Sequence, residues 1–151
     1  MAQNRCFNSS KDFKPEEFIA PVLYTFKDLS TKSGTVFYRE DYLDHLLDYI
    51  QLTGTAATRR HRETHTYLWQ HFADLALSMI KDAGVFESYD YRKGMYKALS
   101  DDAVSFINGH TEDELTRIIK DNFQKNVNLV EAWTKTRPKK IKLIKKAKAT
   151  V

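Results

Sequence analysis

The sequence has little of several features that define specialised classes of protein. Its 151 residues include one cysteine, Cys6, which excludes an internal disulfide framework and a cysteine-rich zinc site. The five glycines are not clustered, so there is no glycine-rich phosphate loop. No apolar run approaches the roughly 20 residues of a membrane span. The polar first residues lack the apolar stretch of a secretory signal. We therefore expect an intracellular, cytoplasmic protein that does not enter a membrane.

What is present suits one packed domain, with 42% hydrophobic and 13% aromatic residues. The formal net charge is +4, from 24 Lys and Arg against 20 Asp and Glu. Eight of these bases and none of the acids lie in residues 135–151, so the preceding residues carry a net charge of −4. A like-charged segment at a chain end is typical of a polyanion-binding arm or of a solvated tail. The sequence thus predicts an acidic body with a cationic tail.

The spacing of apolar residues predicts a mainly helical protein with a small β-hairpin. Residues 1–14 are expected to form a flexible leader. A capping box, Thr111 with Glu114, opens a C-terminal helix over 110–134. The other predicted elements are helices over 15–29, about 39–52, from between Thr58 and Thr66 to Ala83, and over 100–107, and strands over 35–38, 85–91 and 95–99. The last two strands flank the turn Arg92-Lys93-Gly94.

This order of elements resembles a winged helix, a helix-turn-helix with a β-wing. Residues 80–86, the basic turn and residues 96–100 resemble the closing part of such domains, and residues 18–23 with Trp69 are similar to the N-terminal domain of Mrr-type restriction enzymes. The resemblance covers about 18–107. It implies a winged-helix domain over 15–109, followed by the additional C-terminal helix and a basic flexible tail over 135–151.

The resemblance also implies a way to bind double-stranded DNA. The N-terminal residues of the second helix of a helix-turn-helix face base edges in the major groove, and a wing tip contacts the backbone or minor groove. Arginine can make bidentate contacts with guanine or phosphate, and hydroxyl and imidazole groups can bond phosphates. The candidate DNA-binding residues are Arg59, Arg60, Arg62, Thr64 and His65 before or on the helix, Arg92 and Lys93 at the wing tip, and Lys135, Arg137, Lys139, Lys140, Lys142, Lys145 and Lys146 in the tail.

These residues predict a non-enzymatic DNA-binding protein, such as a transcriptional regulator or a small phage, plasmid or chromosomal factor associated with the nucleoid. One alternative is a winged helix that binds protein as an adaptor. Another is a ribonuclease similar to the HEPN family, in which Arg60 and His65 would fit the Arg-x4-His motif. His61 and His65 lack the further ligands of a metal site, so we expect neither metal nor cofactor. The apolar stripe of residues 111–133 predicts either a protein partner or homodimer contact, or packing back on the domain.

Overall fold

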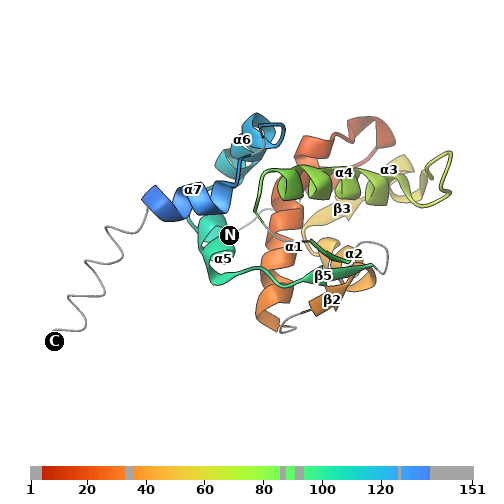
Figure 1. Cartoon of the computed structure of the whole chain (residues 1–151). Coiled ribbons are helices and arrows are strands. Elements are labelled where there is room, and N and C mark those ends of the chain that lie inside the picture. Colours follow the sequence, from red (N-terminus) through yellow and green to blue (C-terminus); the bar gives the residue numbers. More distant parts are fainter. Residues whose placement is uncertain (1–4, 33–35, 86–87, 91–93, 126, 137–151) are drawn as a thin grey trace.

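A long helix, α1 (Ile19–Lys32), lies at the centre of the protein, and other elements pack around it (Figure 1). The structure is a computed structural model. It describes residues 5–32, 36–85, 88–90, 94–125 and 127–136. Over these residues the fold is mainly helical, with a small antiparallel sheet and a separate pair of parallel strands.

Helix α1 is preceded by the 3-10 turn η2 (Pro15–Phe18) and is longer than the sequence predicts. Pro21 is its third residue, where the missing N–H group needs no partner within the helix. The helix was expected to end before Ser30. Instead the Ser30 hydroxyl donates to the Phe26 carbonyl (2.6 Å) and accepts from the Leu99 N–H (2.8 Å). These bonds hold Ser30 within the helix and join it to the chain after the hairpin.

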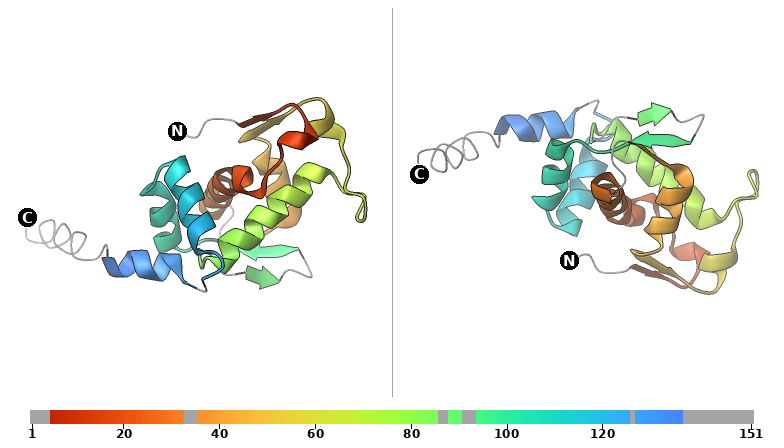
Figure 2. Two further views of the ribbon diagram at one scale, coloured as in Figure 1. Left: turned by 90° about the horizontal axis from the view of Figure 1, so that it is seen from above. Right: turned by 90° about the horizontal axis from the view of Figure 1, so that it is seen from below.

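The predicted hairpin is confirmed, and a third strand completes its sheet. Strands β4 (Ser88–Asp90) and β5 (Met95–Lys97) are antiparallel, and β2 (Val36–Tyr38) pairs with the other edge of β5. The strand order is therefore β2-β5-β4. Figure 2 shows this sheet beside one flank of helix α4 (Leu68–Asp82).

The second predicted helix is wrong in its C-terminal part. Helix α2 (Arg39–Leu46) ends six residues early, and β3 (Ile50–Leu52) follows it. Strand β3 pairs in parallel with β1 (Arg5–Phe7), a strand within the segment expected to be a flexible leader. The Thr53 N–H donates to the Phe7 carbonyl at 3.0 Å and extends this pairing.

Aromatic packing explains why residues 5–13 are ordered. Phe7 and Phe13 are both buried, and the Phe7 ring stacks on Phe18 with 5.1 Å between centroids. The Phe13 ring lies 5.5 Å from that of Phe72 on α4. The free energy gained by burying these rings offsets the chain entropy that the segment loses when it becomes ordered.

The longest helix begins later than expected. A short helix, α3 (Thr55–Thr58), and a loop precede α4, whose first residue is Leu68. Helix α4 ends at Asp82. Gly84 then adopts a positive φ of 74°, which glycine accepts without strain. The predicted stop at this glycine is confirmed.

The C-terminal part contains three helices where the sequence predicts two. Helix α5 (Asp101–Asn108) is capped by Ser100, and α6 (Glu112–Asn122) begins with the predicted capping box. The helix expected over 110–134 is interrupted, and α7 (Leu129–Thr136) starts anew. The Leu129 N–H bonds the Ala83 carbonyl at 2.9 Å, so the chain is fixed to the end of α4 at the interruption.

Of the two interpretations of residues 111–133, packing back on the domain is the one observed. Leu115 and Ile119 of α6 are fully buried and belong to the core around α1. Leu129 is buried, and Trp133 packs partly buried, with its ring 6.1 Å from that of Phe106. The apolar stripe is therefore used largely within the chain.

Candidate nucleic-acid interface

The basic segment that the sequence places at the start of a recognition helix forms a closed loop instead. Arg60 and Tyr67 form an antiparallel bridge. The Leu68 N–H donates to the Arg59 carbonyl (2.8 Å) and the His61 N–H donates to the Thr66 carbonyl (2.7 Å). This loop, residues 59–67, therefore leaves α3 and returns directly to the first residue of α4.

Arg60 contributes to the shape of the loop. Its guanidinium carbon lies 4.3 Å from the centroid of the Tyr67 ring, a cation–π distance. Its Nη1 also donates to the His65 main-chain carbonyl at 2.8 Å. Arg60 and His65, the pair of the ribonuclease-like motif, thus meet through a main-chain atom of the histidine. The guanidinium is occupied within the loop.

The turn of the loop is organised around His61. Its Nδ1 is placed to accept from the N–H groups of Glu63 (3.3 Å) and Thr64 (3.4 Å), which requires the ring proton on Nε2. His65 completes the turn with a positive φ of 59°. The His61 ring packs against His71 of α4, with 4.2 Å between centroids. Thr64 and His65 therefore help to define the turn, and both are exposed.

Arg59 and Arg62 are the bases of this loop whose side chains are exposed and uncommitted. Within the described part of the chain, neither side chain has an ion pair or a hydrogen bond. Both precede α4, whose first turn, Leu68-Trp69-Gln70-His71, carries no lysine or arginine. The sequence placed these arginines near the helix start correctly but assigned them to the wrong kind of element.

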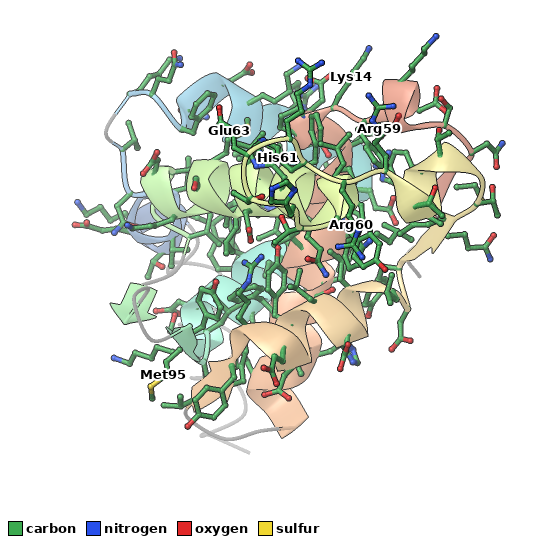
Figure 3. All side chains as sticks on the ribbon, turned by 90° about the vertical axis from the view of Figure 1, so that its right-hand side faces the viewer. Lys14, Arg59, Arg60, His61, Glu63 and Met95 are labelled. Carbon is green, nitrogen blue, oxygen red and sulfur yellow. The ribbon has the colours of Figure 1, made fainter. Side chains whose placement is uncertain are left out.

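Two lysines that sequence analysis assigned to the leader lie at the same end of the protein. The Ser10 N–H donates to Thr55 Oγ1 at 2.9 Å, so the segment containing Lys11 and Lys14 packs on α3. Both lysines are exposed, and Figure 3 shows Lys14 and Arg59 extending to the same side, with Arg60 on the other. The buried Phe7 and Phe13 on either side of Lys11 were the sequence signal for this ordered segment.

We give the name basic end to four exposed bases on two adjoining segments: Lys11 and Lys14 beside α3, and Arg59 and Arg62 on the loop that follows α3. The exposed acids nearest to these residues in the chain are Asp12 and Glu63. The basic end thus has a local excess of positive charge on a body that is acidic overall. Exposed arginine and lysine side chains of this kind bind phosphate groups.

Of the remaining predicted site residues, the structure describes only Lys135, which lies away from the basic end. Lys135 lies near the C-terminus of α7, where it pairs with Glu131 at 3.3 Å. Figures 1 and 2 show α7 and the 59–67 loop at opposite ends of the protein. The predicted wing-tip residues Arg92 and Lys93 lie outside the described residues, as do the tail residues Arg137, Lys139, Lys140, Lys142, Lys145 and Lys146.

Other kinds of site are not formed by the described residues. No three His, Cys, Asp or Glu side chains among them gather as metal ligands. None of the described helices combines the length and apolar character needed to cross a membrane. No family model, curated protein or solved structure matches this chain.

Proposed function

We propose that this protein binds double-stranded DNA without catalysing a reaction, and that the basic end contacts the phosphate backbone. The observation that carries the proposal is the pair Arg59 and Arg62, exposed and unpaired among the described residues on a closed loop. Because the loop is closed by main-chain bonds, little chain entropy remains to be lost on binding. The cationic tail would add further phosphate contacts.

The arrangement of elements supports a winged-helix interpretation. Helix α1, strand β2, helix α2, helix α4 and the β4–β5 hairpin follow one another in the order of a winged helix, and β2 pairs with β5. The insertion of β3, α3 and the 59–67 loop between α2 and α4 is an addition to that order. This insertion carries the basic end.

The charge on α4 favours backbone contacts over base readout. Asp74 is half-exposed and is paired with Arg39 at 2.6 Å. Lys81 is the only Lys or Arg of α4 and lies in its last turn, about 20 Å along the axis from Leu68. Phosphate contacts position a protein on DNA but carry little sequence information. We therefore propose a factor with low sequence specificity.

The test is the salt dependence of DNA affinity in the full-length protein. In the double variant Arg59→Gln/Arg62→Gln, two phosphate contacts are removed, and each contributes about −0.9 to the slope of log K against log salt. The slope should therefore become less steep by about 1.8. Between 50 and 200 mM salt, this difference changes the affinity ratio of wild type and variant by roughly 12-fold. Fluorescence anisotropy with a labelled duplex measures both quantities.

The matched control is Lys81→Gln/Lys125→Gln, which removes the same charge from exposed positions away from the basic end. It should retain the wild-type slope to within about 0.5. A full-length variant with glutamine at the bases of 137–151 measures the tail's own share. Equal losses in the two double variants, or no binding by the wild type at low salt, would contradict the proposal.

A second candidate is the protein-binding adaptor, and exposed apolar side chains favour it. Tyr38 at the end of β2 is 53% exposed and Leu75 of α4 is 38% exposed. Arg39 and Asp74, which are next to Tyr38 and Leu75 in the sequence, form an ion pair. Tyr38 and Leu75 therefore lie on adjoining elements. A DNA contact at this face would leave these apolar groups without a partner. If this face binds protein, Tyr38→Ser/Leu75→Ser should leave the DNA affinity and its salt slope unchanged.

A further inference from the structure

The outer face of α2 concentrates negative charge around an exposed leucine. Leu47, which follows the helix, is 45% exposed. The exposed acids on this face are Glu40, Asp41, Asp44 and Asp48. We call Leu47 and these four acids the α2 face. Four like charges within nine residues repel one another and favour a cationic partner.

Two acids elsewhere in the protein have cationic partners within the fold. Glu16 pairs with Lys120 at 2.5 Å, and Glu17 with Arg5 at 2.5 Å. The hydrogen bond from Lys120 lowers the pKa of Glu16 below its ordinary value. On the α2 face, by contrast, Glu40 and Asp44 have no ion pair with any described residue.

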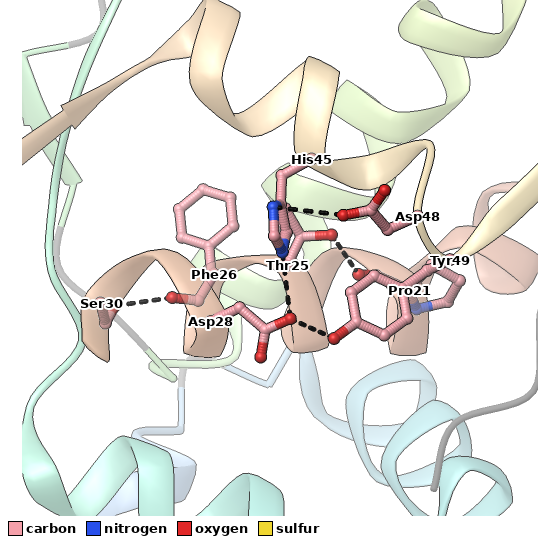
Figure 4. Close-up of polar contacts among 8 residues, drawn as sticks. All are labelled: Pro21, Thr25, Phe26, Asp28, Ser30, His45, Asp48 and Tyr49. Carbon is pink, nitrogen blue, oxygen red and sulfur yellow. Dashed lines mark hydrogen bonds and ion pairs between the residues drawn. The ribbon is translucent and has the colours of Figure 1, made fainter. Parts of the chain in front are cut away.

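The remaining contacts of the α2 face do not neutralise it. The Asp41 carboxylate accepts from the Tyr38 N–H at 3.0 Å, which caps the helix without adding positive charge. His45 lies between two carboxylates, 3.4 Å from Asp48 and 3.1 Å from Asp28 of α1 (Figure 4). Asp28 also accepts a hydrogen bond from the Tyr49 hydroxyl. One histidine thus faces two acids.

The surface at this position is hollowed. A shallow hollow of about 380 Å³ is lined by Leu29, Asp41, Asp44, His45 and Asp48. Leu29 of α1 provides an apolar wall, and the exposed Leu47, directly after α2, offers a further apolar group beside the acids. The α2 face therefore fits a segment in which bases alternate with aliphatic side chains.

We propose that the occupant of the α2 face is the basic tail of the same chain, residues 137–151. This segment carries seven bases and no acid, and the aliphatic residues Ile141, Leu143 and Ile144 stand between its bases. Its composition is complementary to the α2 face in both charge and apolar character.

The length of the tail permits this contact within one chain. Fifteen residues follow Thr136, and an extended chain of that length reaches about 50 Å. A body of about 130 residues has a radius of gyration of only about 14 Å. Because the tail is attached covalently, its effective concentration near the α2 face is in the millimolar range.

Docking of the tail has a consequence for DNA binding, which rests on the proposed function. A tail held on the α2 face withholds its bases from phosphates, so DNA and the α2 face compete for the same segment. The free protein then presents the basic end to DNA while the bases of the tail are occupied. The tail is released when a sufficient length of DNA is bound.

The experiment places a nitroxide spin label in the tail of the full-length chain and measures paramagnetic broadening of backbone amide signals. The labelled variant is Cys6→Ser/Ala149→Cys, in which serine keeps a hydroxyl where the Cys6 thiol meets Gln51 (3.2 Å). Amide signals of residues 40–48 should broaden more than those of α5 and α6. The broadening should disappear at about 1 M salt, where the Debye length is about 3 Å.

Charge variants identify the surface involved. Asp44→Asn/Asp48→Asn should abolish the selective broadening of residues 40–48. The matched control Asp82→Asn/Asp121→Asn removes the same charge from exposed positions near the ends of α4 and α6 and should retain it. Selective broadening at another surface, or none, would overturn the proposal.

Two further experiments distinguish this proposal from a contact between two copies of the chain and from the proposed DNA binding. Mixing isotope-labelled protein without the nitroxide with unlabelled, spin-labelled protein reports contacts between copies. Broadening of residues 40–48 in that mixture, as strong as within one chain, would assign the α2 face to a second copy and refute the proposal. No DNA is present, so the result is independent of the proposed function. Adding duplex DNA then tests competition separately.

Discussion

A single oxygen atom in the core yields the sharpest prediction about stability. Tyr42 of α2 is fully buried, and its hydroxyl has no hydrogen-bond partner among the described residues. Burial raises the pKa of this hydroxyl well above its ordinary value, so the group stays neutral. Its ring packs against Phe26 and Tyr96, with centroids at 5.2 and 5.9 Å. The ring stabilises the core, whereas the hydroxyl loses its hydrogen bonds to water on folding and gains none from the described residues.

Tyr42→Phe removes this oxygen and leaves the ring in place. Burying a hydroxyl without a partner costs about 1–3 kcal/mol, so the substitution should raise the free energy of unfolding by that amount. With an unfolding entropy of about 2.1 cal/mol/K per residue, Tm should rise by roughly 3–9 °C for a chain of this length. Thermal unfolding followed by circular dichroism, and urea unfolding at 25 °C, measure both quantities.

The matched control is Tyr96→Phe, which removes a hydroxyl that has a partner. Tyr96 is buried in the same cluster, and its hydroxyl is hydrogen-bonded to the Arg39 guanidinium. Losing a bond to a charged group should lower the free energy of unfolding by about 1.5–3 kcal/mol. A loss of stability in Tyr42→Phe equal to that in Tyr96→Phe would show that the Tyr42 hydroxyl is bonded and would refute the reasoning.

Three further predictions concern backbone geometry and capping. Gly84→Ala should destabilise the protein by more than about 1 kcal/mol in urea unfolding, because φ is 74° and an added Cβ would lie 2.6 Å from the Asn128 Cα; an unchanged midpoint would contradict this. Thr111→Ala should lower the free energy of unfolding by about 1 kcal/mol, since the Thr111 hydroxyl accepts from the Glu114 N–H at 3.2 Å; the comparison is Thr134→Ala, which removes a half-buried hydroxyl that donates to the Val130 carbonyl within α7 (2.6 Å) and lies outside a cap. The hydrogen bond from the Thr111 N–H lowers the pKa of Glu114 below its ordinary value of 4.5. The stability that the Glu114 carboxylate gives to the folded protein is therefore present above pH 4.5 and is lost as the pH falls through the lowered pKa of the folded state. The difference in Tm between wild type and Glu114→Gln should therefore shrink from about pH 6 to about pH 3, and a constant difference over this range would count against the capping role.

Elements with strong local signals were predictable from the sequence. The β4–β5 hairpin follows from two β-prone runs around a basic turn with glycine, and α6 follows from a capping box. These signals depend on bonds between residues close in sequence, so no knowledge of the rest of the fold is needed.

The errors occurred where distant contacts decide the local structure. Residues 50–52 continue a helical apolar pattern, but they pair with β1 some 45 residues earlier. The segment 59–66 has no strong periodicity, and the bridge between Arg60 and Tyr67 makes it a loop. Short apolar runs fit either a strand or a helix, and a partner strand decides between them.

By itself, the sequence determined the division of charge, the core-facing stripes of α1 and α4, and the caps, because these are set by residue type and short-range spacing. Only the tertiary structure decided which bases share a surface. Lys11 and Lys14 join Arg59 because Phe7 and Phe13 bury their rings and dock the N-terminal segment beside α3. The tertiary structure also places α7, after which the tail begins, at the opposite end of the protein from the basic end, because Leu129 is bonded to the chain at the end of α4. Packing of apolar side chains over long sequence separations, which no local pattern encodes, sets both positions.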